Sequence, residues 1–97
     1  MFVVVALLAI HDGQRAAFEQ FETIAVRVMQ RHGLVLERAV TLDDGRELHV
    51  IRVPSEDAFD AYRADPELAA ALPLRDASVS ATEIARGQDA SYLPPSS

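Results

Sequence analysis

Residues 53–75 read VPSEDAFDAYRADPELAAALPLR, and this stretch decides the fold. A first helix is predicted to begin at Ser55, because serine accepts hydrogen bonds from the free amides of a helix start, and two acidic residues follow it. A second helix is predicted to begin at Asp65 with proline in its first position. Pro54 and Pro73 are expected to bracket the unit, since proline continues neither a strand ladder nor a helix interior.

Outward from this unit, the spacing of apolar residues predicts four strands and one further helix. The strands are expected over 2–10, 34–42, 47–53 and 76–86, and the helix over 14–32. Asp12 is a candidate cap for that helix, Gly33 its expected end, and Asp43-Asp44-Gly45 a hairpin turn.

The element order is strand-helix-strand, twice. Right-handed crossovers then place both helical units on one face of a four-stranded antiparallel sheet, the α+β ferredoxin-like arrangement. Residues 1–87 are expected to form this domain, and residues 88–97 an extended C-terminal tail.

Composition excludes several classes of function. The net charge of −6 argues against a nucleic-acid partner, which needs a basic face. The chain has no cysteine, and its three histidines are dispersed, so a metal site is not expected. The apolar start, Met1–Ile10, has no preceding basic residue and is too short to span a membrane, so we interpret it as a buried strand of a cytoplasmic protein.

The first strand, FVVVALLAI, has no polar residue on either face. Two helical units cover only one face of the sheet, and each apolar side chain left in water forgoes roughly 1.5–3 kcal/mol of burial. The other face therefore needs a cover, and a second copy of the chain is predicted, giving a homodimer.

Strand alternation sorts the remaining side chains into two sets. The set assigned to the helix side is Leu34, Leu36, Val40, Leu42, Leu48, Val50, Val79 and Ala81. The set assigned to the dimer side mixes polar and apolar groups: Val35, Glu37, Ala39, Thr41, His49, Ile51, Ser78, Ser80, Thr82 and Ile84. Such a lining fits a ligand pocket between sheets, or a partly wet dimer interface.

The order of elements, His32-Gly33 after the first helix, and the run Ala58–Glu67 (AFDAYRADPE) ahead of Leu74-Arg75 resemble the dimeric α/β-barrel superfamily. Within it, the chain is most similar to small single-domain proteins of unknown function. The superfamily includes cofactor-free monooxygenases of polyketide-like aromatics, haem-degrading enzymes and lactone isomerases. The absence of Trp and Asn prevents a carry-over of the Asn-Trp-His set of the haem-degrading branch.

Two residues are candidates for catalysis. His49 lies mid-strand on the mixed face, where a neutral imidazole can act as a general base; a hydrogen-bonded interface histidine is the alternative. Tyr62 belongs to the resembling motif and is the second catalytic candidate.

Candidate ligand-binding residues are His11, Glu37, Arg63, Arg75 and Ser80. Either arginine can hold a carboxylate bidentately, or can simply form a surface ion pair. The resemblance implies a small cofactor-independent enzyme, monooxygenase-like or isomerase-like, acting on an organic substrate in a pocket between sheet and helices or between sheets. The alternative is a non-catalytic dimer that binds a small ligand or serves as an interaction module.

Overall fold

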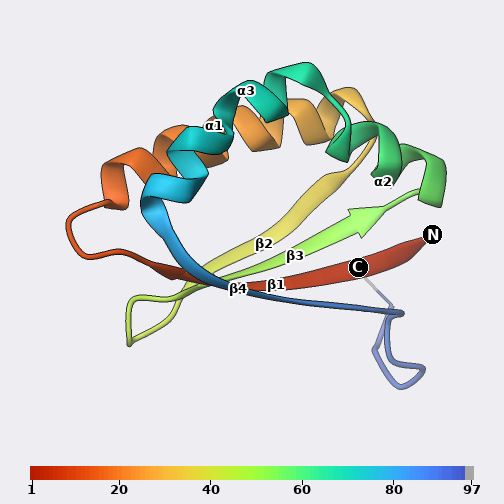
Figure 1. Ribbon diagram of the computed structural model, residues 1–97. Helices are drawn as coiled ribbons and strands as arrows, with labels where there is room; N and C mark the ends of the chain where they lie inside the picture. Colours follow the sequence, from red (N-terminus) through yellow and green to blue (C-terminus); the bar gives the residue numbers. More distant parts are fainter. Residues whose placement is uncertain (96–97) are drawn as a thin grey trace.

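The computed structural model describes residues 1–95, and its helices lie on one face of a single sheet (Figure 1). The sheet order is β2-β3-β1-β4, and all three neighbouring pairs are antiparallel. This confirms the predicted ferredoxin-like arrangement. The elements in chain order are β1 (Phe2–Ile10), α1 (Arg15–Arg31), β2 (Val35–Thr41), β3 (Glu47–Val53), α2 (Glu56–Arg63), α3 (Pro66–Ser78) and β4 (Val79–Gly87).

Most element ends follow the predicted signals. The side chain of Ser55 accepts a hydrogen bond from the Ala58 amide, and Asp65 caps α3 in the same way. Gly33 has a φ of 79°, a left-handed conformation that suits the end of α1. The predicted cap of α1 was wrong: a backbone bond from Gln14 to His11 closes a turn around Asp12, and Gln14 occupies the cap position without a side-chain bond.

Pro73 does not end the second helical unit, contrary to expectation, but lies inside α3. A proline at this position leaves the carbonyl of Ala69 without its helical partner, and Ala69 is exposed, so water can bond that carbonyl. The helix therefore continues through Asp76–Ser78, which had been assigned to the last strand, and β4 begins at Val79.

The predicted strand faces are correct for some residues and reversed for others. On β3, Glu47, His49, Ile51 and Val53 are buried beneath the helices, while Leu48 and Val50 face the opposite side. The pairing Ala6↔His49 fixes this, because directly opposed residues share a face and Ala6 belongs to the core under α1.

Two register shifts explain the remaining reversals. One falls at Glu37, between Leu36 and Arg38, and the other at the junction of β1 with the start of β4. A one-residue bulge moves every later side chain to the other face. For residues that precede the bulges, the predicted strand face is correct: Leu34, Val35, Leu36 and Val79. For residues that follow them, the predicted face is reversed: Ala39, Val40, Thr41, Ala81, Thr82 and Ile84.

The core lies between the sheet and the helices, and Phe59 on α2 packs at its edge. Its ring meets that of Phe2 edge to face, with centroids 5.8 Å apart, and stacks on Tyr62 at 6.5 Å. We expect Phe59→Ala to lower the free energy of unfolding by roughly 2–3 kcal/mol, less than for a fully buried ring. Urea denaturation measures this; Tyr92→Ala, at an 89% exposed site, is the control and should change little. A loss for Phe59→Ala as small as the control's would contradict the packing.

The face of the sheet away from the helices remains largely apolar. Val5 is 37% exposed and Val35 54%, and Leu7, Leu48 and Val50 are half-buried beside them. The tail from Gln88 to Pro95 contains neither helix nor strand and turns back below this face (Figure 1). Ser96 and Ser97 of the predicted tail lie outside the described residues. Within residues 1–95, no helix combines the length and the apolar character needed to cross a membrane.

Candidate functional site

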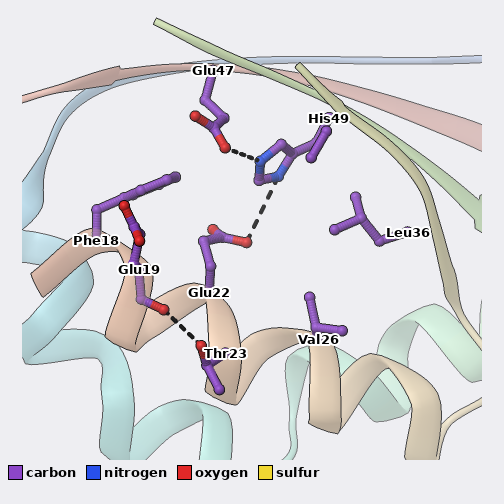
Figure 2. Close-up of a pocket in the computed structure, with 9 residues that line it drawn as sticks. Phe18, Glu19, Glu22, Thr23, Val26, Leu36, Glu47 and His49 are labelled. Atoms are coloured by element: carbon purple, nitrogen blue, oxygen red, sulfur yellow. Dashed lines mark hydrogen bonds and ion pairs between the residues drawn. The ribbon is translucent and has the colours of Figure 1, made fainter. Parts of the chain in front are cut away.

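Two hollows lie between the sheet and the helices, and Glu22 and His49 line both. The first is a cleft of about 420 Å³ between α1 and the strands β2 and β3 (Figure 2). The second, of about 180 Å³, lies beneath all three helices and reaches β4. The smaller cavity is lined mostly by apolar side chains. The larger cleft combines four apolar residues with five polar or charged ones: Glu19, Glu22, Thr23, Glu47 and His49. Glu22 and His49 thus stand at the junction of two spaces that a small organic molecule can enter.

Glu22 projects from α1 towards the sheet. Within residues 1–95, one of its two carboxyl oxygens has no hydrogen-bond partner. That buried atom, Oε2, lies 3.7 Å from Nδ1 of His49, beyond hydrogen-bond distance. Burial raises the pKa of Glu22 to about 7, the negative charge of Glu47 adds to the shift, and the positive charge of Arg75 partly offsets it. Glu22 is therefore a carboxyl group that exchanges a proton near neutral pH.

His49 is 3% exposed and lies on β3 between Glu22 and Glu47. Burial lowers the pKa of His49, and the nearby Glu47 only partly counteracts this, so the imidazole is neutral at pH 7. Its Nε2 lies 3.5 Å from the Glu47 carboxylate. The sequence-based assignment of His49 to the dimer side of the sheet was wrong, because the side chain is buried between the sheet and the helices.

Glu47 is held in a fixed position beside His49 by two hydrogen bonds. Its carboxylate accepts hydrogen bonds from Arg15 at 2.7 Å and from Thr41 at 3.1 Å. Burial acts to raise the pKa of Glu47, but these bonds and the Arg15 charge outweigh it, so the net shift is downward. Glu47 is ionised at neutral pH and therefore favours the His49 tautomer with its proton on Nε2, which leaves the Nδ1 lone pair facing Glu22.

The opposite wall of the smaller cavity carries the motif residues. Burial raises the pKa of Tyr62 to about 12, helped by the charge of Glu22 and opposed by that of Arg75, so the phenol stays protonated and can donate a hydrogen bond. Arg75 donates to Thr82 Oγ1 at 2.8 Å.

Within residues 1–95, no three His, Asp or Glu side chains converge to hold a metal ion.

Four of the residues singled out from the sequence meet in this cavity: His49, Tyr62, Arg63 and Arg75. Arg63 is held at its rim by an ion pair with Asp60 at 2.6 Å.

The other three predicted site residues lie elsewhere. His11 belongs to a separate hollow between the β1–α1 turn and the hairpin. Glu37 is at the β2 bulge and bonds Arg52 at 3.0 Å. Ser80 is exposed at the start of β4. None of them lines either hollow at Glu22 and His49.

Glu22 and Glu47 are site residues that were not predicted from the sequence. Glu22 follows Phe18 by four residues and precedes Ala25 by three, spacings that share a helix face. Glu47 had been noted only as the first residue of a strand. The helix spacing was the signal that could have identified Glu22.

Comparisons with known proteins agree with this fold. No family model matches the chain, and no curated protein does. Solved structures that match include a NIPSNAP domain protein from Burkholderia xenovorans, with 17% identity, a TM-score of 0.77, and 98% of this chain and 100% of that chain covered. An antibiotic biosynthesis monooxygenase matches with 18% identity, a TM-score of 0.75, and 97% and 100% covered.

A third match is SnoaB, a cofactor-independent oxygenase from Streptomyces nogalater, with 18% identity, a TM-score of 0.80 and 97% of each chain covered. These matches confirm the resemblance at the level of the fold. These neighbours share the ferredoxin-like α+β fold of this chain. At such identities they define the fold and not the activity.

Proposed function

We propose that this protein is a small enzyme that removes a proton from an acidic carbon of an apolar organic substrate, with Glu22 and His49 as its acid–base pair. The observation that carries the proposal is the buried Glu22 oxygen beside His49 in the mostly apolar smaller cavity, an oxygen without a hydrogen-bond partner within residues 1–95. A general base works best when its pKa is close to the working pH, and Glu22 meets that condition.

In the proposed step, Glu22 takes the proton, and the electron pair of the broken C–H bond moves into the substrate's carbonyl to form an enolate. His49 then accepts the proton from Glu22 through Nδ1, or Glu22 returns it to another carbon. The protonated Tyr62 lies in the same cavity and can donate a hydrogen bond to the enolate oxygen.

Two outcomes follow from an enolate. Return of the proton at a second position is an isomerisation. In an oxygenation, the enolate carbon of a CH₂ group forms a bond to molecular oxygen and gives a hydroperoxide, which loses water to leave a new carbonyl. The substrate supplies all four electrons, and the similarity to SnoaB, described as a cofactor-independent oxygenase, supports this branch. We therefore propose a monooxygenase-like or isomerase-like activity that needs no bound cofactor, in a protein of the cytoplasm.

The test uses apolar carbon acids, such as cyclic 1,3-diketones and tricyclic anthrone-type ketones, incubated in D₂O without oxygen. NMR should show protein-dependent exchange of the acidic C–H for deuterium above the buffer rate. Oxygen uptake after air is admitted separates the oxygenase-like from the isomerase-like branch. Binding of these compounds without any exchange would overturn the catalytic proposal and favour the alternative, a non-catalytic ligand-binding dimer.

The homodimer expected from the sequence remains a proposal, supported by the apolar face of the sheet opposite the helices. Val5 is exposed in the centre of that face, beside Leu7, Leu48 and Val50. An area this apolar, bordered by charged residues, is typical of an interface between subunits.

We expect Leu7→Asp to convert the dimer to a monomer of native secondary structure, because a charge on each subunit would be buried unpaired at the interface. Light scattering should give about twice the chain mass for the wild type and the chain mass for the variant. Leu72→Asp, at an exposed apolar site on α3, is the control and should stay dimeric. A wild-type protein that is monomeric at micromolar concentration would refute the proposal.

A further inference from the structure

One arginine of the cavity is left without a carboxylate partner. Of the basic side chains that line the two hollows, Arg63 forms an ion pair and Arg75 does not, within residues 1–95. The bond from Arg75 to Thr82 uses only one of the five N–H donors of its guanidinium group. A partly buried arginine with free donors is a ready site for an anionic oxygen.

Arg75 lines the same cavity as the proposed base, Glu22. Glu22 and Tyr62 are close enough to sense the Arg75 charge, yet neither is hydrogen-bonded to it. Most of the other residues that line the cavity are apolar, and Phe21 and Ile51 are among them. A ligand in this space can therefore place an acidic oxygen at Arg75 and an apolar body towards Glu22.

We infer that Arg75 is the anion-binding group of this cavity and holds a carboxylate or enolate oxygen of an otherwise apolar ligand. The inference deepens the proposed function, on which it rests for the identity of the ligand as a substrate: the substrates are carbon acids that carry an anionic oxygen. Binding of an anion at Arg75 can itself be measured without turnover.

An anion at Arg75 also changes the proton balance of Glu22. The charge of Arg75 stabilises the Glu22 carboxylate, and a bound anion cancels that effect, so the ligand and the ionised Glu22 oppose each other. The charged and titratable groups that line the two hollows with Glu22 are Glu19 on α1, Glu47 and His49 on β3, Tyr62 and Arg63 on α2, and Arg75 on α3. Because the pKa of Glu22 is raised to about 7, anion binding should be accompanied by proton uptake at Glu22.

The first experiment compares 2-naphthoate with the neutral 2-naphthamide by fluorescence titration of the whole protein. We expect the wild type to prefer naphthoate, and Arg75→Gln to weaken naphthoate about 10- to 100-fold while leaving naphthamide unchanged. Arg75→Lys should restore part of the preference. Arg38→Gln is the matched control, because Arg38 also lacks an ion pair within residues 1–95 but lies at the β2 bulge outside both hollows.

The second experiment follows naphthoate affinity from pH 8.5 to pH 6, where the probe stays ionised. The wild type should bind more tightly as Glu22 becomes protonated, by an amount on the order of tenfold, and Glu22→Gln should show no such dependence. No naphthoate binding, equal binding of the two probes, or unchanged binding by Arg75→Gln would overturn the inference. Deuterium exchange that persists in any of these cases would leave the proposed function standing.

Discussion

Replacing Glu22 with glutamine is expected to slow deuterium exchange of a carbon acid by roughly 10²- to 10⁴-fold, the usual contribution of a positioned general base. Glutamine keeps the shape of the side chain and its place beside His49, but it cannot accept the proton. In the wild type the rate should rise as pH increases through about 7, where Glu22 loses its proton. The pH–rate profile and the single-variant rate are measured by the same NMR assay.

Glu19→Gln is the matched control for this variant. Glu19 lies on the same helix and lines the same cleft, but its side chain is 65% exposed and pairs with Arg15. Its substitution should change the exchange rate by less than about twofold. A Glu22→Gln protein that retained a third or more of the wild-type rate would remove Glu22 from the chemistry.

The same Glu22→Gln variant is expected to be more stable than the wild type at pH 8, by up to about 3 kcal/mol. The pKa of Glu22 is raised to about 7 in the folded protein, mainly by burial, from a usual value of 4.5. Below pH 4.5 the carboxyl is protonated in both states and adds no pH dependence. Between pH 4.5 and 7 the unfolded chain loses the proton first, so stability falls as pH rises, and above pH 7 the full cost is present.

Urea unfolding of the wild type, Glu22→Gln and Glu19→Gln at pH 5, 6, 7 and 8 measures this effect. The stability difference between Glu22→Gln and the wild type should grow with pH, while Glu19→Gln should follow the wild type. Parallel curves for all three proteins would show that the Glu22 carboxylate is not disfavoured by burial. If Glu22→Gln raises the stability of the protein and also abolishes deuterium exchange of the carbon acid, Glu22 is a residue that serves function at the expense of stability.

Local signals in the chain determined the order and the ends of most elements. The caps at Ser55 and Asp65 and the glycines at 33 and 45 set helix and turn boundaries through their own side chains or backbone conformation, without help from distant residues. The fold class followed from that order, because short right-handed crossovers leave few alternatives. Among the site residues, His49, Tyr62 and Arg75 were found from the sequence, and they share one cavity.

The tertiary structure alone decided which face each strand presents. Apolar side chains lie on both faces of β1 and β3, so polarity did not distinguish the face covered by the helices from the open one. Single-residue shifts in β2 and at the start of β4 then moved the following side chains to the opposite face from the one that strict alternation predicts. The same packing turned Glu22 inward. An acidic residue in a helix is usually solvated, and only the position of α1 over β3 brings this carboxyl beside His49, where burial changes its pKa and gives the site its chemistry.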